Sequence, residues 1–440
     1  MTKFKEPDQR DELKRELGVF QAMMLGLGSI MGTGVFVSIG LGAEIAGNAI
    51  ILAILSAAML AMCNGISSAQ LAANHPVSGG TYEYGYRWLN PRLGFAAGWM
   101  FMFAKSSSAA TAALGVSGYV LHLFDTKQIP VTLLAIIAIA VLSLITLTGI
   151  RRSSMVNTVI VTLTILTLLL FAITGFLSEV THQNHSVSGS LTAVFADTTN
   201  LFEAIALMFV AYTGYGRIAT LGEEVKSPRQ TIPKAIIMTL VLSMTLYILV
   251  CATALKTVGA GEFGRLANQE VAPLHAISLQ FENGLISVLI GVGAITAMVG
   301  VLLNLILGLS RVLMAMGRRR DVPAKLAVVH QESAVPRSAT IVVALLISLL
   351  ALMGDVKLTW SFSAFTVLIY YALTNLCAIR LKSDERMYPI WISYLGLAGC
   401  LFLSFWIEWT VFGFGAGVLV LGLIWQSVVP GRLPSSKATP

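Results

Sequence analysis

Long apolar runs, separated by short polar or charged turns, follow one another along most of the 440 residues. About 20 apolar residues in a row are enough to cross the hydrocarbon core of a bilayer as an α-helix. The pattern therefore predicts an all-α integral membrane protein with twelve spanning helices. Their expected ranges are 18–46, 49–73, 93–122, 129–149, 153–178, 200–225, 231–256, 284–317, 338–354, 357–380, 388–407 and 410–428.

Composition and charge support this interpretation and indicate an orientation. Hydrophobic residues make up 56% of the chain and charged residues 12%, against about 25% charged residues in soluble proteins. If the N-terminus is cytoplasmic, 22 of the 29 Lys and Arg residues fall on that side and four on the other. Because cytoplasmic loops are enriched in these residues, we expect a multi-pass protein of the plasma or inner membrane with both termini cytoplasmic. The net charge of +7 then reflects membrane topology, and nucleic acid is not an expected partner.

Glycines interrupt two of the predicted spans at mid-membrane depth. The first span contains GLGSIMGTGVF (Gly26–Phe36) and the sixth contains FVAYTGYGRIAT (Phe209–Thr220). These small residues could simply permit close helix packing. Interrupted helices in corresponding positions of two halves, however, are typical of secondary transporters built from inverted repeats. The expected parts are a cytoplasmic leader (1–17), two five-helix repeats (18–178 and 200–380), two peripheral helices (388–428) and a cytoplasmic tail (429–440).

A helix break inside the membrane leaves backbone groups that can bind a ligand. If the first span breaks at Gly32, Thr33 and Gly34, the N–H groups of its second half can bind an anion at the positive end of the helix dipole. The carbonyls that end its first half and those at the sixth-span break suit an ammonium group. They belong to Ile30, Val210 and Thr213. Together the two breaks predict a site for a small zwitterion.

The sequence is similar to the amino acid permease branch of the amino acid, polyamine and organocation (APC) superfamily. The similar stretches are GLGSIMGTGVF, HPVSGGTYEYGYRWLNPRLGFAAGW (His75–Trp99), FVAYTGYGRIATLGEEVKSPRQTIPKAI (Phe209–Ile237) and GLSRVLMAMGRRRDVP. The resemblance implies a LeuT-like fold with two inverted five-helix repeats, broken helices 1 and 6, and two peripheral helices. It also implies that the carboxylate meets Thr33 and Gly34, and that Tyr212 and Tyr215 either lie near the side-chain pocket or act as packing aromatics.

The chain departs from that family where ion coupling usually resides. Many relatives have a Lys in helix 5 that stands in for a sodium ion, and aligning Val156–Phe171 puts Thr164 at this position. In helix 3, where relatives often have Glu-Tyr, this chain has Ala104-Lys105. An ionisable side chain inside the membrane usually marks function. Lys105 is expected either to couple protons to transport or to reach the cytoplasmic surface, alone or paired with Glu83.

Two positions in helix 6 also bear on the substrate. Gly216 stands where an acidic residue is common, so an amine without a carboxylate lacks an expected partner here. Arg217 stands where relatives commonly have a small apolar residue. It is expected either to face the substrate or cytoplasmic vestibule, or to pair with Glu223 or Glu224. With Lys105 and Thr164, Arg217 completes the set of coupling candidates.

Other chemistry is sparse in the sequence. No nucleophile, metal-ligand or phosphate-binding constellation is evident, so neither an enzyme nor a protein with a cofactor or metal is expected. The loop His122–Pro130 lacks the Cys that links some relatives to a heavy subunit by a disulfide. Gly291–Leu309 has no adjacent hydroxyl pair for sodium, which leaves protons or plain exchange.

The predicted function is alternating-access transport of neutral L-amino acids, with proton coupling or exchange, in a lipid bilayer. Two alternatives stay open at this point. One is a transporter of cationic amino acids or polyamines, which would use acidic pocket residues. The other is an amino acid sensor that kept the fold and lost transport.

Overall fold

The computed structural model describes residues 17–77, 79–125, 128–148, 154–178, 198–220, 222, 224–269, 272–281, 284–330 and 335–428. Helices dominate this part of the chain, and its only β-type pairing is an isolated bridge between Leu17 and Val225. All twelve predicted spans coincide with helices, which confirms the all-α class.

The first half of the chain contains the first five spans. They are α1 (Val19–Ile30) continued by the π-helical turn η1 (Gly34–Ser38) and α2 (Ile39–Ala46), then α3 (Ile50–Asn74), α5 (Pro91–Leu123), α6 (Val131–Leu147) and α7 (Ser154–Leu177). A short 3₁₀ turn, η2 (Gly47–Ala49), joins α2 to α3. The apolar pattern does not predict α4 (Thr81–Trp88), a short helix between α3 and α5. Its Glu83 in the first turn and Arg87 in the last turn complement the helix dipole.

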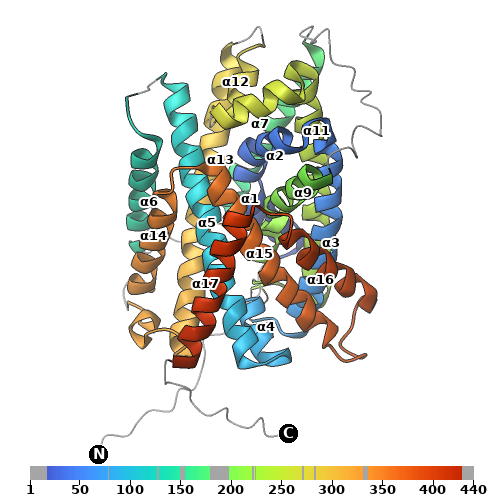
Figure 1. The fold of residues 1–440 in the computed structure, drawn as a ribbon, viewed down its shortest axis with the longest axis vertical. Helices are drawn as coiled ribbons and strands as arrows, with labels where there is room; N and C mark the ends of the chain where they lie inside the picture. The colour runs from blue at the N-terminus through green and yellow to red at the C-terminus, as the bar shows by residue number, and fades with distance from the viewer. Residues whose placement is uncertain are drawn as a thin grey trace, which may run out of the picture.

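The second half repeats the pattern and adds two helices. Its elements are α9 (Thr198–Tyr212), η3 (Thr213–Tyr215), α10 (Gly216–Ala219), α11 (Pro228–Gln269), α12 (Pro273–Ser278), α13 (Gly284–Arg318), η4 (Ala324–Ala327), α14 (Arg337–Ala351), α15 (Val356–Ile379), α16 (Ile390–Ser404) and α17 (Trp409–Val428). α11 runs well past the predicted end of its span and turns at Gly259, whose φ is 73°. This is the LeuT-like arrangement of two five-helix repeats and two peripheral helices (Figure 1).

The outer surface of the bundle is suited to lipid. Within the described residues, seven helical stretches are long and apolar enough to cross a membrane, and four shorter helices are also apolar. Large apolar side chains are exposed along α6 and α7, among them Leu133, Ile137, Leu144, Leu163 and Leu166. A water-soluble protein rarely exposes an apolar surface of this extent.

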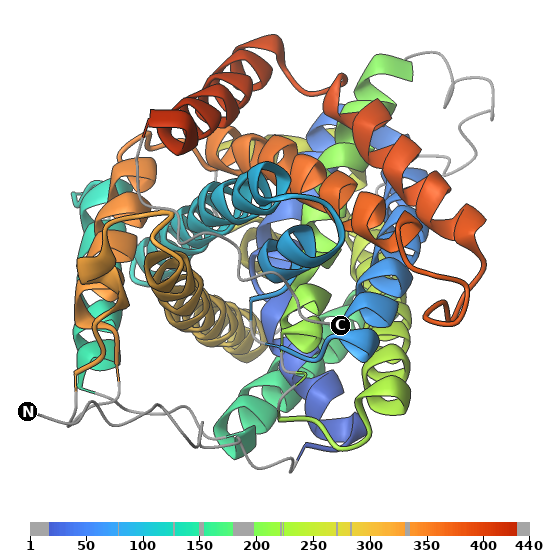
Figure 2. The ribbon, with the colours of Figure 1, turned by 90° about the horizontal axis from the view of Figure 1, so that it is seen from below.

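The polar core of the bundle lies along α5. Figures 1 and 2 place α5 inside the bundle, with α6 and α14 on one side and α16 and α17 at the periphery. Its hydroxyl groups pair with α15: Ser108 Oγ lies 2.7 Å from Ser363 Oγ, and Thr111 Oγ1 donates to Thr359 Oγ1 at 2.9 Å. Hydroxyl groups away from water need such partners, and these pairs hold α5 against α15.

Candidate functional site

Both predicted helix breaks are present at the centre of the bundle. α1 ends at Ile30, Met31 leaves helical geometry with a ψ of 73°, and helical hydrogen bonding resumes after Gly32. In the sixth span, α9 ends at Tyr212 and the 3₁₀ turn η3 begins at Thr213. The predicted break in helix 1 is confirmed, but its non-helical residues are Met31 and Gly32, and Thr33 and Gly34 already belong to the second half-helix.

The two breaks pack directly against each other. A Cβ atom on Gly214 would lie 2.5 Å from the carbonyl carbon and oxygen of Ser29, so only glycine fits at this point of η3. The hydroxyl of Tyr247, on α11, donates to Ile30 O at 3.0 Å and to Ala211 O at 3.1 Å. One side chain therefore ties the end of α1 to the end of α9.

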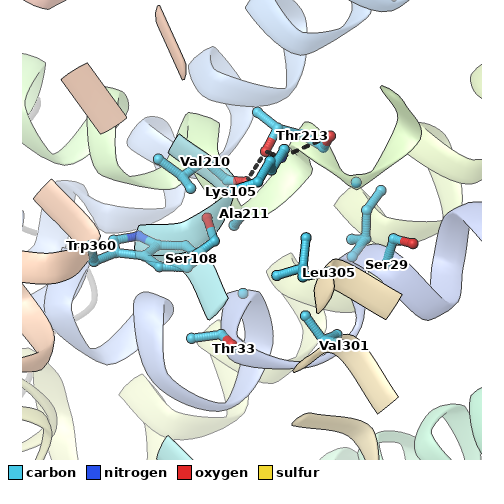
Figure 3. Close-up of a pocket in the computed structure, with 13 residues that line it drawn as sticks. Ser29, Thr33, Lys105, Ser108, Val210, Ala211, Thr213, Val301, Leu305 and Trp360 are labelled. Carbon is cyan, nitrogen blue, oxygen red and sulfur yellow. Dashed lines mark hydrogen bonds between the residues drawn. The ribbon is translucent and has the colours of Figure 1, made fainter. Parts of the chain in front are cut away.

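A small cavity lies between the breaks, α5, α13 and α15 (Figure 3). It is lined by Ser29, Ile30, Thr33, Gly34, Lys105, Ser108, Val210, Ala211, Thr213, Gly214, Val301, Leu305 and Trp360. Its volume is about 30 Å³, which is room for roughly two waters. An amino acid needs more space than this, so the helices around the cavity must separate before one can bind.

Thr33 gives one side of the cavity the character of an anion site. Its side chain is 3% exposed, and its Oγ1 has no hydrogen-bond partner within the described part of the chain. It stands at the start of the second half-helix, where the first N–H groups have no acceptor within the helix. Gly34 follows, and a Cβ on it would collide with the Tyr247 hydroxyl and lie 3.1 Å from Ala211 Cβ. A carboxylate here would receive hydrogen bonds from Thr33 and from the backbone at the positive end of the dipole.

Protein donors already fill the opposite side, where a substrate amine was predicted. Lys105 Nζ donates to Thr213 Oγ1 at 2.8 Å and lies 3.4 Å from Thr213 O, as the dashed lines in Figure 3 show. Thr213 Oγ1 in turn donates to Val210 O at 2.7 Å. Tyr371 donates to Thr213 O at 3.2 Å. The carbonyls of Ile30, Val210 and Thr213, which were predicted to bind the amine, therefore border the cavity. Each of them already accepts a hydrogen bond from a side chain, and for Ile30 that side chain is Tyr247.

The remaining pocket residues predicted from the sequence do not line the cavity. Tyr212 is fully buried, reaches toward Ile54 O at 3.4 Å, and packs on Tyr247. Tyr215 packs on Tyr371 with ring centroids 5.4 Å apart. Both tyrosines occupy the positions expected of packing aromatics, the second of the two interpretations. Gly32 and Gly216 are also outside the lining, and a Cβ on Gly216 would lie 2.9 Å from the Tyr371 hydroxyl.

The three coupling candidates lie in different environments. Lys105 lines the cavity and is 8% exposed. It does not pair with Glu83, which forms an ion pair with Arg319 instead. Thr164 is buried and donates to Ile160 O in its own helix at 2.8 Å. Of the three, only Lys105 belongs to the site.

Arg217 lies outside the cavity, on α10. Its guanidinium faces α13, and a Cβ on Gly308 would lie 3.9 Å from Arg217 Nη1. Among the described residues no ion pair forms between Arg217 and Glu224. The other predicted partner, Glu223, lies outside the described residues.

Sequence reasoning missed three aromatic residues at the site. Tyr247 and Tyr371 bind the broken helices, and Trp360 donates from Nε1 to Leu207 O at 3.0 Å beside the cavity. Tyr247 is the only tyrosine of its predicted span, 231–256, and a lone phenol at mid-membrane depth was an available signal. Its two partners could not be read from the sequence, because Ile30 is 217 residues away.

Comparison with known proteins gives a consistent result over nearly the whole chain. The model of the family described as amino acid permease matches residues 21–438. An uncharacterized transporter of Mycobacterium tuberculosis is 37% identical, covering 94% of this chain and 91% of its own length. A branched-chain amino acid permease of Bacillus subtilis is 31% identical, covering 74% of this chain and 72% of its own. A serine/threonine exchanger of the same organism is 26% identical, covering 89% and 90%.

Proposed function

This chain belongs to the amino acid permease family, and on that premise we propose that it carries neutral L-amino acids across a cell membrane by alternating access. The observation that carries the proposal is the unpartnered, buried hydroxyl of Thr33 at the start of the second half of helix 1. A carboxylate supplies the missing partner and suits the positive end of the helix dipole. An amine without a carboxylate, as in a polyamine, leaves this part of the site unused.

The lining supports a substrate with an uncharged side chain. Among the residues that line the cavity there is no Asp or Glu, and the one charged side chain is that of Lys105. A cationic side chain would therefore meet a like charge without a compensating carboxylate. The apolar lining consists of Ile30, Val210, Ala211, Val301, Leu305 and Trp360. Relatives are named for branched-chain amino acids, for serine and threonine, and for cationic amino acids, so the choice of an uncharged side chain rests on the lining alone.

Movement of the broken helices is needed for access. Leu17, two residues before α1, is tied to the segment that follows α10, since Leu17 N donates to Glu224 O at 3.0 Å and Lys226 N donates to Leu17 O at 2.9 Å. Tyr247 ties the same two helices at their centres. We propose that α1 and α10, the halves of helices 1 and 6 that these contacts join, move together when the cavity opens.

Lys105 is the proposed link between substrate and protons. Its amino group holds the Thr213 acceptors that an incoming α-ammonium would use. An amino acid therefore binds fully only when Lys105 moves aside or gives up its proton. This competition couples substrate occupancy to a protonation change, because each state of Lys105 has a different affinity for the substrate.

The direct test is a substrate screen on the purified protein. Thermal stabilisation is measured with each of the twenty amino acids and with spermidine, and the strongest ligands are then tested for uptake into proteoliposomes. We expect stabilisation and uptake for amino acids with apolar or hydroxyl side chains. Strongest stabilisation by Arg, Lys or spermidine would contradict the proposal, and stabilisation without uptake would support a sensor.

A further inference from the structure

Among the described residues, one side of the cavity has a buried hydroxyl without a partner, whereas the acceptors predicted for an amine on the other side already have donors. On the anion side, Thr33 Oγ1 is buried without a partner among the described residues. On the other side, the acceptors at Ile30, Val210 and Thr213 are bound by Tyr247, by the Thr213 hydroxyl, and by Lys105 with Tyr371. A carboxylate can use the free hydroxyl and the positive end of the half-helix dipole, and Lys105 already occupies the acceptors that a substrate amine would use.

Lys105 stands where the amine of a zwitterion would stand. Its Nζ lies 2.8 Å from Thr213 Oγ1, and its side chain is 8% exposed. In Figure 3 it approaches Thr213 from α5, while Thr33 lies on the opposite side of the drawn cluster. A carboxylate bound at Thr33 would share the cavity with this amino group, and an opposite charge in the same cavity favours the ammonium form.

We propose that Lys105 takes the place of the substrate's α-ammonium, so that the site also binds small carboxylates that lack an amine. The chemical class is a 2-hydroxy or 2-oxo acid with a short uncharged side chain. The inference rests on the proposed function, because it places the carboxylate at Thr33 and Gly34 and the side chain against Val301 and Leu305. It extends that function because the site then has two binding modes. It binds a zwitterion when Lys105 has withdrawn, and it binds an amine-free anion when Lys105 stays in place.

The two binding modes differ in how the positive charge of Lys105 is compensated. A zwitterion bound beside an ammonium at Lys105 would bring two positive groups to the Thr213 acceptors, and the lining offers no carboxylate to compensate them. An amine-free anion neutralises the ammonium and leaves the hydrogen bonds from Lys105 and Tyr371 intact. Paired charges are the ones that a buried site tolerates.

The test compares matched ligands that differ only at the amine. Binding of L-alanine and L-lactate, and of L-valine and L-2-hydroxyisovalerate, is measured calorimetrically at one pH on the purified full-length protein. Wild-type protein should bind each hydroxy acid within about tenfold of its amino acid or more tightly. In Lys105→Met the ratio of hydroxy acid affinity to amino acid affinity should fall by about tenfold or more, since about 1.4 kcal/mol of charge pairing corresponds to that factor.

Two further variants keep the result interpretable. Lys105→Gln preserves a donor for Thr213 and should lower the same ratio, which covers the case in which Lys105→Met does not fold. Lys256→Met removes a lysine that bonds Phe176 O at 2.7 Å, outside the site, and should leave the ratio unchanged. Amino acid binding without any hydroxy acid binding would overturn the inference and leave the proposed function intact. Failure of both ligand classes to bind would overturn both proposals, and an unchanged ratio in the Lys105 variants would overturn the role of Lys105.

Discussion

Gly34 stands where the account places the substrate carboxylate. Gly34 lines the cavity, and a Cβ there would collide with the Tyr247 hydroxyl and lie 3.1 Å from Ala211 Cβ. Gly34→Leu should therefore abolish amino acid binding and uptake. The matched control is Gly417→Leu on α17, where an added Cβ meets no atom within 4 Å. Unchanged affinity in a Gly34→Leu protein that folds would show that the carboxylate binds elsewhere.

Lys105 should govern the response of transport to pH. Removal of its proton removes the charge that competes with the substrate amine, so amino acid binding should strengthen as pH rises, up to the pH at which the substrate amine itself deprotonates. Titratable groups on neighbouring elements include the phenols of Tyr371, Tyr215, Tyr247, Tyr212 and Tyr370. Uptake into proteoliposomes is measured at a series of pH values below the pKa of the substrate amine, for wild type and for Lys105→Met.

The Lys105 prediction has a clear contrary result. Lys105→Met should flatten the pH profile, and Lys105→Arg should also flatten it while keeping the charge, since a guanidinium does not titrate in this range. Profiles that match the wild type in both variants would assign no coupling to Lys105, and the protein would then act as an exchanger or uniporter.

At the scale of elements, one side chain bonds both helix breaks. Tyr247 donates to the terminal carbonyls of α1 and α9. Tyr247→Phe leaves two buried acceptors without this donor, at a cost of about 1–3 kcal/mol. The thermal midpoint should fall, whereas Tyr394→Phe, at a side chain that is 53% exposed, should leave it unchanged. Equal midpoints for both variants would show that the breaks are stable without the Tyr247 contact.

A second contact joins α12, which lies between two membrane-spanning helices, to the last turn of α5. The Nδ1 atoms of His275 on α12 and His122 on α5 are 2.8 Å apart. Burial and the neighbouring His122 lower the pKa of His275 to about 4, below its ordinary value of about 6.5. The fold therefore favours the neutral ring, and its contribution to stability is present above pH ~6.5 and is lost as the pH falls toward 4.

The expected readout is a thermal midpoint that decreases over this acidic range. His275→Gln should reduce the size of that decrease, because the group that must be protonated is gone. His330→Gln, outside this contact, serves as the control. If the thermal midpoint of His275→Gln decreases as much as that of the wild type when the pH falls, groups other than His275 cause the decrease.

At the scale of the whole molecule, the physics of the bilayer determined which features the sequence could predict. The spans followed from the length of the apolar runs, and the breaks followed from glycine clusters in corresponding positions of the two halves. Lys105 was recognised because an ionisable group is costly in the membrane. Its partner Thr213, 108 residues away, was not predicted, because nothing in the local pattern brings α5 to η3. For the same reason the sequence left open whether Tyr212 and Tyr215 line the pocket or pack, and it did not indicate that Tyr247 and Tyr371 contact the breaks.

The central claim is that the second half of helix 1 binds the substrate carboxylate through Thr33. The most direct test is the variant Thr33→Val, which replaces a buried hydroxyl that has no partner among the described residues by a methyl group of similar size. We predict an unchanged or higher thermal midpoint without substrate. The affinity for the best amino acid should fall about tenfold or more, because a hydrogen bond to a charged group contributes about 1.5–3 kcal/mol. An affinity equal to that of the wild type, in a protein of unchanged stability, would contradict the account.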